Sequence, residues 1–172
     1  DREHTDSFEQ TVEKVRFLVT DSIKRQLVSD VPLCTFLSGG LDSSLISSVT
    51  NEEFRKRGEV LHTFSVDYKD NDKYFRKSKF QPNSDPEYIR IMEKYLGGAH
   101  HWIVIDTAEL VDALYSSVDA RDLPGMADVD ASMLLLCKAI KEYGTVALSG
   151  ECADEIFGGY PWYRDKTIRS SE

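Results

Sequence analysis

Residues 33–44 combine a hydrophobic run, two adjacent glycines and several hydroxyl and carboxylate groups, a combination suited to binding phosphate. The segment reads LCTFLSGGLDSS, so the hydrophobic run stops at Ser38 and a helical pattern begins just after Gly40. Backbone N–H groups at the start of a helix have no intrahelical partner and, together with the helix dipole, favour an anion there. Glycine lets the backbone approach a phosphate because it has no Cβ atom. We therefore expect a strand, a tight turn and a helix whose first turn binds phosphate.

The polar side chains of this turn predict how a phosphate would be bound. Ser38, Ser43 and Ser44 supply hydroxyl donors, and Asp42 supplies a carboxylate that can bind a metal ion. The Walker A loop ends in Gly-Lys-Ser or Gly-Lys-Thr, whereas Leu41, Asp42 and Ser43 stand here. A phosphate loop with an acid and no lysine favours a pyrophosphate clamp in which Mg²⁺ neutralises charge. The alternative is a glycine turn followed by a serine-rich helix cap.

A second Ser-Gly corner near residue 149 repeats the layout of the first. Leu37-Ser38-Gly39 is followed by Asp42, and Leu148-Ser149-Gly150 is followed by Asp154. In open parallel sheets, ligands bind outside the carboxyl ends of the strands, where the strand order switches. If the two strands are neighbours, both aspartates face one crevice and form, with phosphate oxygens, a site suited to Mg²⁺. The alternative for the acids around Asp154 is their ordinary preference for the first turn of a helix.

Length and composition indicate one acidic globular domain. The chain has 172 residues, of which 41% are hydrophobic and 30% charged, and its net charge is −9. This charge argues against nucleic acid or an anionic membrane as a partner, and a bound phosphate would need a local cation. Three cysteines without CxxC spacing suit a reducing compartment such as the cytoplasm. The polar first residues and short hydrophobic runs predict neither a signal peptide nor a membrane span.

Strand and helix patterns alternate along the chain, which predicts an α/β fold with a parallel sheet covered on both faces. Hydrophobic residues from Phe8 to Leu27 recur at helical spacing after a cap at Thr5, Asp6 or Ser7, and this helix should pack on the outside of the domain. Residues 67–84 carry no pattern and should form a long loop, either a solvated segment or one that closes over a polyanionic ligand. The expected strands are 33–37, 61–66, 101–105 and 145–148, and the other expected helices are 42–57, 85–96, 107–118, 130–143 and a short one from Cys152 or Ala153.

The two corners together resemble the synthetase domain of asparagine synthetase, a member of the PP-loop ATP pyrophosphatases. Ser38-Gly39-Gly40-Leu41-Asp42-Ser43 matches the pyrophosphate loop also found in NAD synthetase and GMP synthetase. The segment SGECADEIFGGY, from Ser149 to Tyr160, is more specific and resembles the signature of asparagine synthetases and their β-lactam synthetase relatives. The resemblance implies a Rossmann-like parallel sheet with helices on both faces, of the adenine nucleotide alpha hydrolase type, over residues 1–172.

The resemblance also implies roles for individual residues. The adenine base would lie near Leu37 and Val66, and the ribose and α-phosphate near Ser149 and Gly150. Glu151 would lie beside the activated carboxyl group, where it would position substrate or accept a proton. The implied catalytic residues are Glu151, Asp42 and Asp154, of which Asp42 and Asp154 would bind Mg²⁺; the implied ATP-binding residues are Leu37, Ser38, Gly39, Gly40, Leu41, Asp42, Ser43, Ser44, Val66, Ser149 and Gly150.

The reaction implied by the resemblance is ATP-dependent amide synthesis. The side-chain carboxylate of aspartate would attack the α-phosphorus of ATP and release pyrophosphate, and ammonia would then convert β-aspartyl-AMP to asparagine. In the family, ammonia comes from glutamine through a glutaminase domain, and a homodimer is possible. We expect this chain to be the ATP-binding fragment, without the glutaminase domain and the later helical portion. The alternatives are a β-lactam synthetase-like ligase acting on another acid, and a nucleotide-binding module without turnover.

Residues near the second corner carry three further expectations. Cys152 stands where the family usually has glycine and is either a passive small residue or a nucleophile with a lowered pKa at a helix start. Gly158 and Gly159 predict a sharp turn that ends the short helix. Trp162 and Tyr163, which follow this turn, should pack beneath the site.

Overall fold

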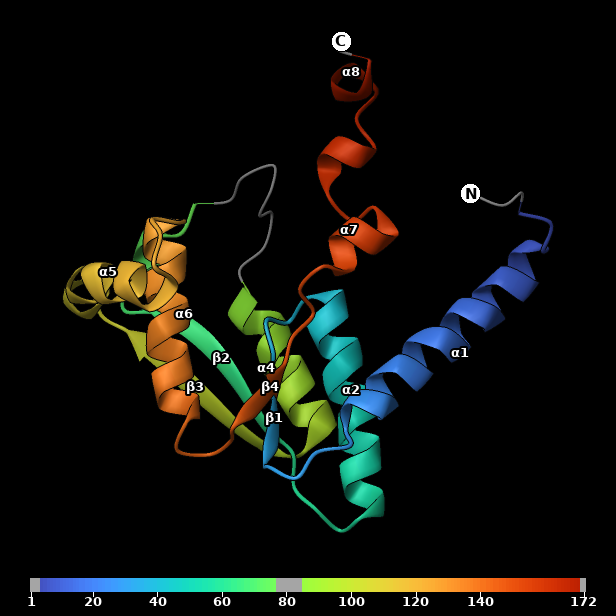
Figure 1. The fold of residues 1–172 in the computed structure, drawn as a ribbon, viewed down its shortest axis with the longest axis horizontal. Coiled ribbons are helices and arrows are strands. Elements are labelled where there is room, and N and C mark those ends of the chain that lie inside the picture. The colour runs from blue at the N-terminus through green and yellow to red at the C-terminus, as the bar shows by residue number, and fades with distance from the viewer. Residues whose placement is uncertain (1–3, 77–84, 171–172) are drawn as a thin grey trace.

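A four-stranded parallel sheet lies between two layers of helices in the computed structural model, which describes residues 4–76 and 85–170 (Figure 1). The α/β fold predicted from the alternating patterns is therefore confirmed. The strands are β1 (Leu33–Phe36), β2 (His62–Tyr68), β3 (Ala99–Ile105) and β4 (Val146–Leu148). The helices are α1 (Phe8–Gln26), α2 (Leu41–Lys56), α3 (Asn71–Tyr74), α4 (Asp85–Leu96), α5 (Thr107–Arg121), α6 (Ala127–Ile140), α7 (Ala153–Phe157), the 3-10 helix η1 (Pro161–Tyr163) and α8 (Lys166–Arg169).

Both faces of the sheet carry a hydrophobic core. Helices α1, α2 and α4 cover one face, and α6, with α5 outside it, covers the other (Figure 1). Successive side chains of a strand point to opposite faces, so Leu33 packs on the first side and Cys34 on the second. The buried clusters are Leu27, Leu33, Phe54 and Leu61 under α1 and α2; Leu37, Ile89 and Leu96 under α4; and Cys34, Phe64, Leu136 and Ile140 under α6.

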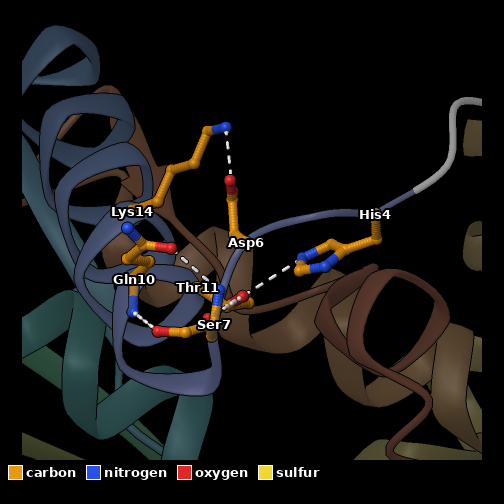
Figure 2. A network of polar contacts seen from close by, with 6 residues as sticks. All are labelled: His4, Asp6, Ser7, Gln10, Thr11 and Lys14. Atoms are coloured by element: carbon orange, nitrogen blue, oxygen red, sulfur yellow. Dashed lines mark hydrogen bonds and ion pairs between the residues drawn. The ribbon is translucent and has the colours of Figure 1, made fainter.

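The long first helix packs on the outside of the domain, as predicted, and its amino-terminal half projects away from the sheet (Figure 1). Of the three candidate caps, Ser7 is the one used. Its hydroxyl accepts from the N–H of Gln10 at 3.2 Å, and the Gln10 side chain accepts from the N–H of Ser7 at 2.8 Å (Figure 2). This reciprocal capping box fixes where α1 begins. Among residues 4–76 and 85–170, none of the helices combines the length and hydrophobicity needed to cross a bilayer.

The strand order places the two Ser-Gly corners next to each other. The order is β3-β2-β1-β4, so the chain proceeds outward from β1 to β3 and then returns to form β4 on the other side of β1. β1 and β4 pair in parallel, with Leu33 opposite Val146 and Thr35 opposite Leu148. The expectation that these two strands are neighbours in the sheet is therefore confirmed. Their carboxyl ends form the switch point at which such sheets bind ligands.

The prediction of a long loop over residues 67–84 is wrong for the first part of that segment. β2 continues to Tyr68 because it pairs with β3 along its whole length, up to Tyr68 opposite Ile105. The short helix α3 then follows Asp70, which has a left-handed φ of 61°. Residues 77–84 lie outside the described part of the chain, so closure of this segment over a ligand stays a prediction.

Helix α6 begins and ends three residues earlier than its hydrophobic pattern predicts. The cause at its start is the carboxylate of Asp130, which accepts from the N–H of Met126 at 2.7 Å and from the guanidinium of Arg121. These bonds satisfy a backbone donor in front of the helix and allow it to start at Ala127.

Candidate functional site

Hydrogen bonds among serine hydroxyls close the first corner, between β1 and α2. The Ser43 hydroxyl accepts from the N–H of Ser38 at 3.1 Å, lies 2.9 Å from the Ser38 hydroxyl and donates to the carbonyl of Gly40 at 3.3 Å. Gly40 is the N-cap of α2, and no side chain caps the helix there. The N–H groups of the first turn of α2 therefore remain available to an anion.

Gly39 allows this corner to approach helix α4. Its φ is 78°, a left-handed conformation that suits glycine. A Cβ atom on Gly39 would lie 2.9 Å from the Cβ of Tyr88 and 3.0 Å from the N of Ile89. In this structure Gly39 packs the corner against a neighbouring helix, which is a different task from the phosphate approach that its sequence position suggested.

Gly150 brings the second corner into contact with the first. A Cβ atom on Gly150 would lie 2.9 Å from the Cβ of Asp42 and 3.2 Å from the N of Ser43. The Ser149 hydroxyl accepts from the N–H of Glu151 at 3.1 Å, which tightens the turn after β4. The two corners thus lie against each other, and only a residue without a side chain fits between them.

An open cavity of about 370 Å³ lies where the two corners meet. It brings together most of the residues that the sequence singled out. Gly39, Leu41 and Ser44 do not line it, and Leu41 is 82% exposed. The predicted residues that line the cavity are Leu37, Ser38, Gly40, Asp42, Ser43, Val66, Ser149, Gly150, Glu151 and Asp154.

One part of this cavity is hydrophobic and suits a planar base. Besides β1 and the residue after it, three elements outside the two corners contribute to its lining, namely β2, α4 and α6. The residues of α6, Met133 and Leu136, are three positions apart and share a helix face, a spacing that predicts only core packing. Sequence reasoning therefore missed them. The hydrophobic lining residues besides Leu37 and Val66 are Phe36, Phe64, Ile89, Met133 and Leu136.

The other part of the cavity is strongly acidic. Five carboxylate residues line it, and no lysine, arginine or histidine does so within residues 4–76 and 85–170. A nucleotide triphosphate should bind such a cavity more tightly with a cation that offsets the repulsion between phosphate and carboxylate. The acidic lining residues are Asp42, Asp85, Glu151, Asp154 and Glu155.

The donor set fits Mg²⁺ bound together with a nucleotide. In the described part of the chain, no three His, Cys, Asp or Glu side chains are placed to hold a metal ion by themselves. Asp42 and Asp154 both line the cavity and offer oxygen ligands. Mg²⁺ is commonly bound by one or two carboxylates plus phosphate oxygens and water, so two aspartates suffice when a triphosphate supplies the remainder.

An aromatic residue, Tyr160, forms part of the acidic wall. Its hydroxyl donates to Glu155 at 2.9 Å, and this hydrogen bond raises the pKa of Tyr160 to about 12. Trp162 stacks on Tyr160 with ring centroids 4.3 Å apart and an interplanar angle of 13°. Trp162 and Tyr163 are each 44% exposed and do not line the cavity, so the prediction that they pack beneath the site is wrong. Among the described residues, Trp162 is linked to the site through its stacking on Tyr160.

The turn at Cys152 and the turn at Gly158 both use left-handed backbone. Cys152 lines the cavity at the start of α7 with a φ of 69°, the conformation that glycine adopts most easily. The two roles predicted for its thiol, a passive small group or a nucleophile, both stay predictions. Gly158 ends α7 with a φ of 66°, which confirms the sharp turn predicted there.

Comparison with known proteins identifies the family of this chain. The family model described as asparagine synthase matches residues 14–172. The chain is 56% identical over 168 residues to asparagine synthetase (glutamine-hydrolyzing) 3 of Bacillus subtilis, an alignment that covers 97% of this chain and 27% of that protein. It is 34% identical over 164 residues to asparagine synthetase B (glutamine-hydrolyzing) of Escherichia coli, over 87% of this chain and 27% of that protein. The chain thus spans about a quarter of the length of these relatives.

Among solved structures, the glutamine-dependent NAD+ synthetase of Acinetobacter baumannii, in complex with ADP, is similar in fold. The TM-score is 0.53 at 18% sequence identity, over 94% of this chain and 30% of that chain. This likeness confirms the predicted Rossmann-like α/β fold. Since the family model covers nearly all of the sequence, the chain belongs to the asparagine synthase family.

Proposed function

We propose that this chain is the ATP-binding part of a larger synthetase that activates the side-chain carboxylate of aspartate and converts it to the amide of asparagine. The observation that carries the proposal is the contact of Gly150 with Asp42, because it joins the two corners around one cavity. Membership of the asparagine synthase family supports the choice of reaction. The names of the two bacterial relatives support glutamine as the source of ammonia.

The shape and charge of the cavity support one orientation of ATP. The adenine base would occupy the hydrophobic part, near Leu37 and Val66. The ribose and α-phosphate would lie at Ser149 and Gly150. The pyrophosphate would then lie at residues 38–44, where the first turn of α2 offers uncapped N–H groups. Asp42 and Asp154 would hold Mg²⁺, which offsets the negative charge of the phosphates when bound.

In the first step, a carboxylate oxygen of aspartate attacks the α-phosphorus, and the bond from that phosphorus to the pyrophosphate oxygen breaks. The products are β-aspartyl-AMP and pyrophosphate. The N–H groups and hydroxyls of the first corner would position the phosphates and stabilise the charge that develops on the leaving group. In the second step, ammonia attacks the acyl carbon and AMP leaves. Glu151, which lines the cavity, would position the reactants or accept the proton that the attacking ammonia loses as the amide forms.

The cysteines of the chain suit the cytoplasm as the place of this reaction. Cys34, Cys137 and Cys152 are free thiols in the structure. Unpaired cysteines are typical of a reducing compartment. We further propose that a glutaminase domain of the same polypeptide supplies ammonia, as the names of the relatives suggest.

Exchange of labelled pyrophosphate into ATP tests the proposal, since it reports acyl-adenylate formation without the second step. The complete polypeptide that contains this chain should catalyse exchange that depends on aspartate and Mg²⁺. Asp42→Asn and Asp154→Asn should each reduce the rate by at least about a hundredfold, the size typical for loss of a group that stabilises transition-state charge. Exchange with another acid and none with aspartate would indicate a β-lactam synthetase-like ligase. Binding of ATP without exchange for any acid would indicate a module without turnover.

A further inference from the structure

The chain reverses direction immediately after α7, and this turn returns an aromatic residue to the helix that it has just left. Gly158 adopts a φ of 66°, and the N–H of Gly159 donates to the carbonyl of Asp154 at 3.0 Å. A Cβ atom on Gly159 would collide with the carboxylate of Asp154. The left-handed φ of Gly158 favours glycine, and the turn places Tyr160 beside the α7 residue Glu155.

Tyr160 and Trp162 restrict the Glu155 side chain. A glutamate in the exposed first turn of a short helix ordinarily samples several rotamers. Here its Oε1 accepts from the Tyr160 hydroxyl at 2.9 Å, and the Tyr160 ring is itself stacked on Trp162 at 4.3 Å. Trp162 is 44% exposed, so it contributes little to the core. Its closest ring partner among the described residues is Tyr160, which lines the cavity.

A fixed carboxylate at this place has an electrostatic consequence. Glu155 and Tyr160 both line the cavity, which has acidic side chains and no basic ones in the described part of the chain. An added negative charge on the wall repels metal-free ATP more strongly than the magnesium-loaded nucleotide, because the cation cancels part of the phosphate charge. The penalty is larger when the carboxylate is fixed at the wall than when it can rotate into solvent.

We infer that Tyr160 and Trp162 are positioning residues that hold the Glu155 carboxylate at the cavity wall, where it makes the site select Mg·ATP over metal-free ATP. This inference rests on the proposed binding of ATP. It concerns the ratio of two affinities and requires no turnover.

Titration calorimetry on the complete polypeptide that contains this chain tests the inference, with Mg·ATP in one series and ATP with EDTA in the other. The measured quantity is the Kd for metal-free ATP divided by the Kd for Mg·ATP. Glu155→Gln should lower this ratio about tenfold, as removal of a nearby like charge in a site of intermediate dielectric predicts. Tyr160→Phe and Trp162→Leu should each lower it about threefold, less than removal of the charge does, because the released carboxylate keeps its charge and still spends part of its time at the wall. The double variant Glu155→Gln/Tyr160→Phe should give the same ratio as Glu155→Gln, because the hydroxyl acts through the carboxylate.

Two matched variants separate positioning from general stability. Trp162→Phe keeps a ring on Tyr160 and should preserve the wild-type ratio. Tyr163→Phe removes the hydroxyl of the other tyrosine in the segment, which does not line the cavity, and should also preserve it. A purely structural role would weaken both nucleotide forms equally and leave the ratio unchanged.

The outcomes distinguish this inference from the proposed function. Wild-type binding of Mg·ATP with an unchanged ratio in Glu155→Gln and Tyr160→Phe would overturn the inference and leave the proposed function intact. A wild-type chain that is folded by circular dichroism and binds neither form would contradict the proposed function itself, and the inference with it.

Discussion

At the residue scale, backbone strain is concentrated at a position on the cavity wall. Cys152 adopts a φ of 69° at the start of α7, a conformation that glycine adopts most easily. A residue with a Cβ atom in this conformation costs on the order of 1–3 kcal/mol. The strain lies on the wall of the cavity, directly between Glu151 and the acidic helix.

Cys152→Gly should increase the free energy of unfolding by about 1 kcal/mol. Relief of the left-handed strain exceeds the entropy that glycine adds to the unfolded chain. Urea unfolding followed by circular dichroism measures the change. Cys152→Ala keeps the Cβ atom and should stay within about 0.5 kcal/mol of the wild type. Equal stability of the glycine and alanine variants would contradict the strain argument.

Residue types and spacing predicted one half of the candidate site. Asp42 and Asp154 could be predicted because each follows a Ser-Gly corner within a few residues. Of the hydrophobic half, only Leu37 and Val66 were predicted, since Met133 reaches the cavity from a helix whose pattern is that of ordinary core packing. The bond between Tyr160 and Glu155 was also missed, although the two glycines before Tyr160 signal the turn that creates it.

At the scale of elements, the site depends on how closely the turn after β4 approaches the start of α2. Gly150 is the point of contact, with no room for a side chain between it and Asp42. The arrangement of the two corners around one cavity therefore depends on the close approach of Gly150 to Asp42.

Gly150→Ala should lower the free energy of unfolding by about 1–3 kcal/mol, the usual cost of overpacking a close contact. Its Cβ atom would lie 2.9 Å from the Cβ of Asp42, so the two corners must move apart. Mg·ATP should also bind more weakly, because Asp42 and Asp154 would separate. Urea unfolding and calorimetry measure the two effects. A variant as stable as the wild type, with unchanged affinity, would show that the corners are not in close contact.

A second interelement contact joins β2 and β3 through histidines. His62 Nδ1 and His101 Nε2 lie 2.8 Å apart, and the rings stack with centroids 5.1 Å apart. Burial lowers the pKa of His101, and the neighbouring His62 lowers it further. Burial also lowers the pKa of His100. In each case the folded chain favours the neutral ring.

Stability should therefore fall as the pH drops below the ordinary histidine pKa of about 6.5. In that range the unfolded chain binds protons that the folded chain excludes, so protonation favours unfolding. The stabilising contribution is fully present above this pH and decreases toward the lower pKa of the folded state. Unfolding free energies at about pH 7.5 and 5 measure the decline. His101→Phe, which keeps an aromatic ring beside Phe64 and Tyr143, should show a smaller decline. An identical decline in that variant would contradict the assignment.

The elements themselves were largely predictable from hydrophobic period and turn residues, and the exceptions have nonlocal causes. β2 extends to Tyr68 because β3 pairs with it there, a fact that no local pattern contains. α6 starts early because Asp130 binds the N–H of Met126 and also pairs with Arg121 of the preceding helix. Side-chain bonds of this kind shift a helix boundary without changing the hydrophobic pattern.

At the scale of the whole molecule, charge connects the fold to its proposed ligand. The chain carries a net charge of −9, and the lining of the cavity within the described residues has acids and no bases. A polyanion should therefore bind there more tightly together with a divalent cation. The acidic composition predicted that a bound phosphate needs a cation. The strand order β3-β2-β1-β4 places the two corners side by side, so that both aspartates line one cavity.

The most direct measurement is the affinity of the chain for Mg·ATP, with and without these two carboxylates. The wild type should bind one Mg·ATP, and Asp42→Asn/Asp154→Asn should weaken binding by at least about a hundredfold, since both proposed ligands of the cation lose their charge. Asp112→Asn/Asp119→Asn, on the exposed side of α5, changes the net charge equally and should bind as the wild type does. Equal affinity of the wild type and the Asp42/Asp154 variant, both folded, would contradict the account.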